Sequence, residues 1–251
     1  MKLPPLAIQT CVFGKSFNQV EEADFDQVLA AVKNAGFDAV EASFPDAGVL
    51  QRLLTRHGLK QAARHMTISH FTDPEPVFRE FAVTGARDVC NSGLLKWGEL
   101  TTEDYHRSIE VLNDLGRKLR AEGIHLHYHN HDFEFSPVAG GKKGIDLLLE
   151  GLDFSIIDLC VDVAWVWRGG LDPAAFLREH AERIGYLHLK DTTETDWTEL
   201  GRGLLDWKTI LETVENMPHV RWATVEQDST KIDPAQSCQI SRAFLRENFD
   251  Y

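Results

Sequence analysis

Cysteine is scarce in this sequence, and no two cysteines have the spacing of a zinc knuckle or a redox motif. The 251 residues contain four cysteines that are far apart along the chain: Cys11, Cys90, Cys160 and Cys238. Isolated cysteines are typical of free thiols in a reducing compartment and argue against a disulfide framework. We therefore expect a protein that is located in the cytoplasm.

Long apolar runs and a surplus of basic residues are also missing. No stretch approaches the ~20 apolar residues of a membrane span, and residues 1–8 lack the apolar region of a signal peptide. Lysine and arginine total 26 against 39 aspartates and glutamates, which gives a formal net charge of −13. Because an acidic chain binds poorly to nucleic-acid backbones and anionic membranes, we expect neither as a partner and a small molecule instead.

Strand-like and helix-like segments alternate along the chain, and 43% of the residues are hydrophobic, enough for a sizeable core. Strands are predicted over 6–12, 37–42, 60–68, 86–90, from 124 onward, and over 155–162, 185–190 and 221–226. Helices are predicted over 24–34, 49–57, 101–122, 144–150, 173–183 and 207–217, and two more begin at Asp73-Pro74 and Asp233-Pro234, with Asp as N-cap. This alternation predicts a (β/α)8 TIM barrel, a single domain of residues 1–251.

The fifth strand is rich in histidine. Four of the eleven histidines occupy every second position of residues 124–135: His125, His127, His129 and His131. Alternation with apolar residues marks a strand with two different faces, and a face of histidine is costly to bury unless it binds something. We expect His125 and His127 to be hydrogen-bonded within the core, and His129 and His131 to reach the end of the strand.

Polar side chains also alternate with apolar ones on the three strands that follow. If the apolar faces pack under the helices, the polar faces point into the barrel. The side chains expected inside lie late in their strands, at the end where barrel enzymes keep their active sites: His129, His131, Asp162, His188, Lys190 and Glu226. Four neighbouring strands therefore bring imidazoles and carboxylates to one place.

Two imidazoles and two carboxylates form a mixed nitrogen and oxygen site for a divalent cation. The predicted metal ligands are His129, Asp162, His188 and Glu226. This set suits Mn²⁺, Fe²⁺, Co²⁺ or Zn²⁺ better than Ca²⁺, and Mg²⁺ remains possible. The alternative is that these buried groups pair with one another, but their convergence at strand ends favours a metal because unpaired buried charges are rare.

Four further side chains are candidates for substrate contacts. Lys190 could hold a substrate oxygen or polarise a carbonyl, or form a salt bridge to the carboxylate of Asp162 or of the adjacent residue 191. Trp165 and Trp167 could wall a sugar-sized pocket, although packing at the top of the barrel is the alternative, especially for Trp167. Glu41, at the inward end of the second strand, is expected to touch the substrate.

Five motifs resemble those of the sugar phosphate isomerase/epimerase family, the xylose-isomerase-like TIM barrels. They are Y-H-N-H-D-F-E-F (128–135), L-C-V-D-V-A-W-V (159–166), L-H-L-K-D (187–191), L-G-R-G-L-L-D-W (200–207) and V-E-Q-D (225–228). The resemblance covers nearly the whole chain. It implies a TIM barrel in which four strand-end ligands hold a divalent metal, commonly Mn²⁺, and three of these positions correspond to Asp162, His188 and Glu226.

The fourth position departs from the epimerases that the chain resembles. Those enzymes carry a glutamate where this chain has His129, and they use two metal-bound glutamates as acid and base on opposite faces of the substrate. Here only Glu226 occupies a matching place, so a two-glutamate mechanism would need Glu134 as the second carboxylate. The subgroup with H-N-H-D-F-E-F resembles sugar isomerases and also barrels that act on keto-sugars and inososes by elimination.

The resemblance implies a divalent-metal-dependent sugar isomerase or epimerase that transfers a proton through a metal-stabilised enediolate of a ketose or keto-sugar. Glu226 or Glu134 would be the base, and His131 and Lys190 would supply the acid or orient the substrate. The alternatives are a lyase or dehydratase acting on an inosose or keto-glycoside, a phosphodiesterase of the endonuclease type, which the acidic charge disfavours, and a non-catalytic sugar-binding barrel, which the intact ligand set disfavours. A homo-oligomer is possible.

Overall fold

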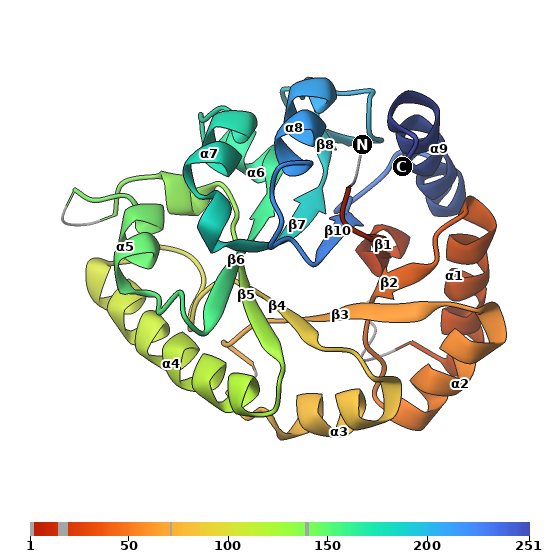
Figure 1. Ribbon diagram of the computed structural model, residues 1–251, viewed down its shortest axis with the longest axis horizontal. Coiled ribbons are helices and arrows are strands. Elements are labelled where there is room, and N and C mark those ends of the chain that lie inside the picture. The colour runs from red at the N-terminus through yellow and green to blue at the C-terminus, as the bar shows by residue number, and fades with distance from the viewer. Residues whose placement is uncertain (1–2, 15–19, 71, 139–140) are drawn as a thin grey trace.

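The computed structural model describes residues 3–14, 20–70, 72–138 and 141–251. Within these ranges, eight parallel strands close into a barrel in the order β1, β10, β7, β6, β5, β4, β3, β2, as Figure 1 shows. The strands are β1 (Leu6–Gln9), β2 (Ala39–Glu41), β3 (Lys60–Met66), β4 (Asp88–Ser92), β5 (His125–His129), β6 (Ile157–Asp162), β7 (Ile184–Leu189) and β10 (Trp222–Val225). The predicted (β/α)8 barrel is confirmed.

Helices surround the barrel and cover the outward faces of its strands (Figure 1). They are α1 (Glu22–Ala35), α2 (Ala47–His57), α3 (Glu75–Thr84), α4 (Thr102–Ala121), α5 (Gly144–Gly151), α7 (Pro173–Glu179), α8 (Trp207–Val214) and α9 (Pro234–Phe249). Their starts follow from capping: Asp172 and Asp233 accept from the backbone of Ala175 and Gln236, as the Asp-Pro pairs predicted. No helix in the described part of the chain is long and apolar enough to cross a membrane.

Several predicted boundaries were wrong, and each has a local cause. The first strand ends at Gln9 because a 3₁₀ helix, η1 (Thr10–Phe13), follows and closes at Gly14 with a positive φ of 68°. Helix α3 begins one residue later than expected, since Pro74 is its N-cap and Asp73 accepts from the Glu75 N–H. The helix predicted over 173–183 ends at Glu179 and continues as a separate 3₁₀ turn, η4 (Ala181–Arg183).

Two elements beside the barrel mouth were not predicted. A short helix, α6 (Val163–Arg168), follows β6 directly, because the Asp162 carboxylate caps it by accepting from the N–H groups of Ala164 and Trp165. After β7, a two-stranded hairpin forms from β8 (Asp191–Thr192) and β9 (Trp197–Thr198). Both elements lie at the carboxyl ends of their strands and help to enclose the centre of the barrel.

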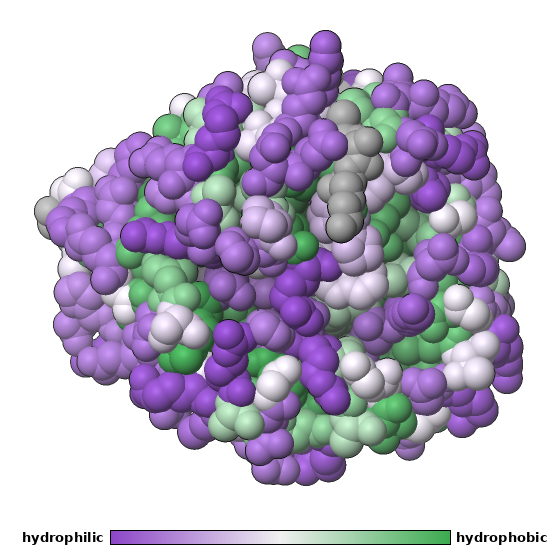
Figure 2. Space-filling model, in the orientation of Figure 1, coloured by the Kyte–Doolittle hydropathy of each residue, from purple (hydrophilic) through white to green (hydrophobic). Residues whose placement is uncertain are grey.

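The interior of the barrel is polar or small where the outside is apolar. Ile157, Leu159 and Val161 of β6 belong to the apolar core outside the barrel, whereas Cys160 packs inside with Ala63, Cys90 and Tyr186. The outer surface of the molecule is mainly hydrophilic on the side drawn in Figure 2, with apolar residues in small patches. The alternation that the sequence suggested for these strands is therefore present.

The lower histidines of β5 have different surroundings. His127 is buried, as predicted, and its Nε2 lies 3.0 Å from Oδ1 of Asp88. His125, expected in the core, is instead half-buried at the amino-terminal end of the barrel, where its Nδ1 lies 2.7 Å from Nη1 of Arg120. Because β5 begins at His125, no earlier residue of the strand covers its side chain at the amino-terminal end of the barrel.

Replacement of Asp88 by asparagine is expected to destabilise the fold. Arg221 donates to Asp88 from Nε (2.5 Å) and Nη2 (3.3 Å), and although burial acts to raise the pKa of Asp88, His127 and Arg221 outweigh it and lower the pKa. We expect a loss of roughly 2–3 kcal/mol at pH 7, less than the ~3–5 kcal/mol of a fully buried pair, because 37% of the Arg221 side chain is exposed.

The pH dependence of this effect has a defined sign. A carboxylate with a lowered pKa stabilises the fold above its unfolded pKa of about 3.9, and this contribution disappears as the pH falls through the lower folded value. Urea unfolding at pH 7 and in the acid range should therefore show the two proteins converging in acid. An equal difference at every pH would contradict the role of the Asp88 charge.

Candidate metal and substrate site

Four side chains meet at the carboxyl ends of β5, β6, β7 and β10. They are His129, Asp162, His188 and Glu226, all buried, and one ligand atom of each lies within 4.8 Å of the others. Strand register explains the meeting: Asp162 pairs with His188, and His188 pairs with Thr224, two residues before Glu226. The structure thus brings together the four residues that the sequence predicted as metal ligands.

Polar atoms that lack hydrogen bonds among the described residues face one another inside this group. Nδ1 of His188 and Oε2 of Glu226 are in ion-pair contact, yet neither has a hydrogen bond of normal geometry among the described residues, and nor does Oδ2 of Asp162. Buried polar atoms are normally hydrogen-bonded, because leaving one unpaired costs about 1–3 kcal/mol. A buried imidazole nitrogen and buried carboxylate oxygens that face one another without hydrogen bonds are suitable ligands for a divalent metal ion.

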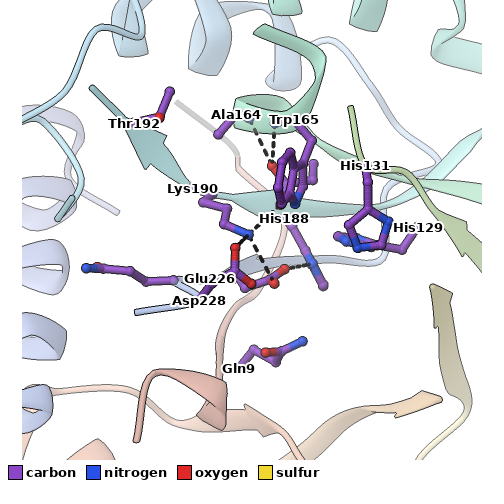
Figure 3. Close-up of polar contacts among 12 residues, drawn as sticks. Gln9, His129, His131, Ala164, Trp165, His188, Lys190, Thr192, Glu226 and Asp228 are labelled. Carbon is purple, nitrogen blue, oxygen red and sulfur yellow. Dashed lines mark hydrogen bonds and ion pairs between the residues drawn. The ribbon is translucent and has the colours of Figure 1, made fainter. Parts of the chain in front are cut away.

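Lys190 lies beside this group and is surrounded by carboxylates. Its Nζ is 2.5 Å from Oδ2 of Asp228, 3.3 Å from Oε1 of Glu226 and 3.5 Å from Oδ2 of Asp162. Figure 3 shows the lysine pointing toward Asp228 and Glu226. Burial acts to lower the pKa of Lys190, but the carboxylates outweigh it and raise the pKa, so the side chain is an ammonium ion. The salt bridge to Asp162 is therefore present, and Asp228 is a partner that the sequence reasoning missed.

The carboxylate of Glu226 is held in its ionised form. Burial alone would raise its pKa, but the charges of Lys190 and His188 outweigh burial and hold the pKa well below its usual value. For His188, burial acts to lower the pKa, and the carboxylates of Glu41 and Glu226 reverse this and raise it. Asp162 differs, because burial raises its pKa to about 7, so Glu226 is the carboxylate of the group that its neighbours hold in the charged form.

Glu41 faces the same space from β2. Its Oε2 lies 3.0 Å from Nε2 of His188, and its Oε1 lies 2.8 Å from Nδ1 of His65. His65 in turn lies 2.9 Å from the hydroxyl of Ser92. The sequence reasoning missed His65 and Ser92, although both stand late in their strands, the same signal that identified Asp162 and His188.

A pocket of about 490 Å³ opens above these side chains, a volume that suits a small molecule. Its polar lining includes Glu41, His65, Ser92, His129, His131, Glu226 and Asp228. Glu41 therefore lies where a substrate contact was expected, and the expected convergence of His129, His131 and Glu226 on one space is found.

His131 stands at the pocket wall among aromatic rings. Its ring centroid is 5.4 Å from that of Trp165 and 5.5 Å from that of Trp97, and Nδ1 has no hydrogen bond among the described residues. Burial lowers the pKa of His131 to about 4. The imidazole is therefore neutral near pH 7, which suits a hydrogen bond to a substrate hydroxyl better than proton donation from an imidazolium.

The tryptophans have separate positions. Trp165 covers Lys190, whose Nζ lies 4.9 Å from its ring centroid and 4.3 Å from that of Trp197 in β9, and Figure 3 shows Trp165 above the lysine. These contacts place Trp165 over the cation, not in the lining of the pocket. Trp167 packs against the core, which is the alternative that the sequence favoured for it.

Glu134 is not brought into the pocket. It lies in a 3₁₀ helix, η3 (Phe133–Phe135), where its Oε1 accepts from the Tyr128 hydroxyl and its Oε2 accepts from the His131 N–H, each at 2.8 Å. Burial raises the pKa of Glu134 to about 7. Both oxygens are used to hold the segment that carries His131, which suits a positioning residue better than the second base.

Asp191 explains the glycine motif that follows β7. Its Oδ2 accepts from the N–H groups of Gly201 and Gly203 and from the Trp207 indole, at 2.9, 3.1 and 2.7 Å. A Cβ atom on Gly203 would lie 2.1 Å from Oδ1 of Asp191, so only glycine fits. The buried carboxylate of Asp191 therefore holds the segment that follows Lys190 in place through hydrogen bonds. Among the described ion pairs, it has none with Lys190.

A closed (β/α)8 barrel with ionisable side chains gathered at the carboxyl ends of its strands has the architecture of a barrel enzyme. The model of the xylose isomerase-like TIM barrel family matches residues 29–248. The chain therefore belongs to the xylose isomerase-like TIM barrel family, which confirms the resemblance found in its motifs.

Curated relatives and solved structures agree with this family. An inosose dehydratase from Clostridium beijerinckii is 25% identical over 272 residues, with 90% of each chain covered. A sugar phosphate isomerase/epimerase from Parabacteroides distasonis superposes with a TM-score of 0.82 at 20% identity, covering 99% of this chain and 96% of the other. These relatives bear the names of enzymes of more than one reaction type.

Two further structures share the fold and contain ligands. A D-allulose 3-epimerase from Methylomonas sp., in complex with D-allulose, has a TM-score of 0.73 at 16% identity and covers 99% and 98% of the two chains. A xylose isomerase-like TIM barrel protein from Mycobacterium smegmatis, in complex with magnesium, has a TM-score of 0.72 at 15% identity and covers 98% and 96%. At these identities the likeness concerns the fold.

Proposed function

We propose that this protein is a divalent-metal-dependent sugar isomerase or epimerase acting on a small ketose or keto-sugar. The observation that carries the proposal is the group of His129, Asp162, His188 and Glu226. Three buried atoms of this group, Oδ2 of Asp162, Nδ1 of His188 and Oε2 of Glu226, have no hydrogen bond among the described residues. These four residues would hold the metal. The pocket above them is polar and of a size that suits a free sugar or a ketone derived from a polyol.

Mn²⁺ is the metal that we propose, with Mg²⁺, Co²⁺, Fe²⁺ and Zn²⁺ as alternatives, because the donor set combines nitrogen and oxygen. When bound, a divalent ion would polarise the substrate carbonyl and stabilise the negative charge that develops on neighbouring oxygens. Metal analysis of the purified protein by mass spectrometry, before and after dialysis against a chelator, identifies the ion.

The side chains around the pocket supply the proton transfer. Glu226, held ionised by Lys190 and His188, is the base that takes a proton from the carbon next to the carbonyl. Lys190 keeps a positive charge beside the same carboxylate and can hold a substrate oxygen. His131 is neutral and its Nδ1 has no hydrogen bond among the described residues, so it would orient a substrate hydroxyl.

Elimination of water is the second candidate function. The metal group contains a single glutamate, with His129 in place of the second one, so the symmetrical acid and base of an epimerase are not both present in it. A relative that matches over 90% of the chain, at 25% identity, is named inosose dehydratase. After the same first step, loss of a hydroxyl from the next carbon would give dehydration of an inosose or keto-glycoside.

Exchange of carbon-bound hydrogen for deuterium tests the common first step. The protein with Mn²⁺ should exchange the hydrogen next to the carbonyl of at least one member of a panel of ketoses, inososes and keto-glycosides in D₂O, as seen by NMR. Products then separate the two functions, since a new sugar isomer indicates isomerisation or epimerisation and a loss of water indicates elimination. Absence of exchange with every member and every metal would reject the proposal.

The oligomeric state and the compartment stay predictions. A homo-oligomer is one possibility that the resemblance to other barrels allows, and light scattering of the purified protein measures the oligomeric state. The cytoplasmic location was inferred from scattered cysteines, and Cys11, Cys90, Cys160 and Cys238 are free thiols in the structure. Because the net charge is −13, nucleic acid is not expected to be a partner.

A further inference from the structure

The pocket wall formed by β2, β3 and β4 carries a second hydrogen-bonded group. Glu41 ends β2, His65 lies late in β3 and Ser92 ends β4, and all three line the pocket. Nε2 of His65 lies 2.9 Å from the Ser92 hydroxyl, and Nδ1 of His65 lies 2.8 Å from Oε1 of Glu41. Hydroxyl, imidazole and carboxylate thus form one continuous chain of hydrogen bonds.

The direction of these hydrogen bonds follows from their chemistry. Glu41 is 1% exposed, and its two oxygens face two imidazole nitrogens, Nδ1 of His65 at 2.8 Å and Nε2 of His188 at 3.0 Å, as an accepting carboxylate does. Nε2 of Gln9 lies 3.1 Å from the same Nδ1 and also donates to Oε1 of Glu41. With the Gln9 hydrogen on Glu41, we assign the hydrogen of His65 to Nδ1, because a carboxylate can only accept, and Nε2 is left to accept from the Ser92 hydroxyl. A hydroxyl, a base and a third group that orients the base are the arrangement that activates side-chain hydroxyls in enzymes.

The position of this group relative to Glu226 follows from the barrel. In the closed order of strands, β4 and β10 are four places apart, which puts them on opposite walls. Ser92 ends β4 and Glu226 follows β10 directly, and both line the same pocket. A substrate bound between these walls meets the Glu226 carboxylate on one side and the Ser92 hydroxyl on the other.

We propose that Ser92, His65 and Glu41 form a second proton-transfer unit of the active site, which rests on the function proposed above. Ser92 is the catalytic residue that contacts a substrate oxygen, His65 takes and returns the proton, and Glu41 is a positioning residue. This unit supplies, on the wall facing Glu226, a proton-handling group that the metal cluster lacks because His129 stands where a second glutamate would.

The proton balance of the step is complete within the site. The Ser92 oxygen takes the proton of a substrate hydroxyl as its own proton passes to Nε2 of His65, whose new positive charge lies beside Glu41. The reverse transfer gives the proton to another oxygen of the substrate in an isomerisation, or to the departing hydroxyl in a dehydration. Glu226 handles the proton on carbon, so the two units act on different bonds.

Ser92→Ala separates the two units experimentally. Because the variant keeps Glu226, we expect exchange of carbon-bound hydrogen in D₂O within about threefold of the wild type. Formation of product should fall by about 10²-fold, the lower end of what general acid–base groups contribute. Ser69→Ala is the matched control. Ser69 lies on the loop after β3, and its hydroxyl is 3.1 Å from that of Thr67, so it does not belong to the hydrogen-bonded group of Ser92, His65 and Glu41.

His65→Ala provides a second variant that keeps the proposal testable if Ser92→Ala is unstable. It should lose product formation to a similar degree, and added imidazole should restore part of it, since 27% of the His65 side chain is exposed and opens to the pocket. A merely structural role would show no rescue. If either variant lost exchange and product formation equally, or lost neither, the proposal would be overturned.

A readout without turnover distinguishes this proposal from the proposed function. Long-range ¹H–¹⁵N NMR of the histidine rings should show His65 with its hydrogen on Nδ1, and Glu41→Gln should change that signal. Hydrogen on Nε2 would overturn the hydrogen-bond chain whatever the activity. Conversely, the wild-type protein could exchange no substrate hydrogen while His65 has the expected tautomer. That result would reject the proposed function but would not contradict the chain of hydrogen bonds from Ser92 to Glu41.

Discussion

Glu226→Gln is expected to abolish the exchange of carbon-bound hydrogen and to weaken metal binding together. Glu226 contributes an oxygen to the four-residue group and is the only glutamate in it, so the amide removes both a charged ligand and the base. Loss of a general base costs about 10²–10⁴-fold in rate, and loss of a ligand adds to this, so we expect a decrease of at least ~10³-fold.

The measurement combines three readouts on the same preparation. Exchange in D₂O reports the base, metal content after dialysis reports the ligand, and thermal unfolding reports the fold. Glu247→Gln is the matched control, because Glu247 is an exposed residue of α9 paired with Arg246, and this change should alter none of the three.

Variants of the other predicted ligands separate metal binding from base catalysis. Asp162→Asn and His188→Ala should lose metal content while Glu226 remains, and excess Mn²⁺ should partly restore exchange in them. The same excess should not restore exchange in Glu226→Gln, because the base is absent. If all three variants kept full metal content and full exchange, the proposed site would be wrong.

Asp191→Asn is expected to be the most destabilising single substitution outside the metal group. The buried carboxylate accepts from the N–H groups of Gly201 and Gly203 and from the Trp207 indole, and it also accepts from its neighbour Thr192. An amide would turn a donor toward other donors and remove the charge that strengthens each bond. Since hydrogen bonds to charged groups contribute ~1.5–3 kcal/mol each, we expect a loss of about 3–5 kcal/mol.

Denaturant unfolding measures this loss, and Asp206→Asn is its matched control. Asp206 also accepts from a backbone N–H, that of Thr209, but it is an exposed N-cap of α8, where a substitution costs ~1 kcal/mol or less. Product formation by Asp191→Asn should also fall, because the anchored segment follows Lys190 directly. Equal losses of stability in the two variants would contradict the role of Asp191.

The predicted ligand group was accessible to sequence reasoning for a simple physical reason. Alternation on a strand decides which side chains point inward, and parallel strands bring residues late in their sequences to the same end. Those two rules were enough for Asp162, His188 and Glu226, which lie on β6, β7 and directly after β10. They were also enough to place Glu41 at the pocket.

The roles of side chains that depend on contacts between distant elements were harder to predict from the sequence. Glu134 seemed available as a second base, but the Tyr128 hydroxyl and the His131 N–H occupy its oxygens, and neither bond follows from spacing along the chain. The hairpin that covers Lys190 was missed because it is held by Asp191 through residues ten or more positions away. Such contacts have no periodic signature.

By itself, the sequence determined the barrel and the chemical nature of the groups at its carboxyl end, because these follow from alternation, capping and strand order. The tertiary structure alone decided which of those groups are already paired and which are not. Closure of the barrel sets Glu41, His65 and Ser92 on the wall across from Glu226. It also leaves Asp162 and His188 each with an atom that has no hydrogen bond to any residue that the structure describes. Those distances arise from packing between strands that are remote in the chain, which local sequence does not encode.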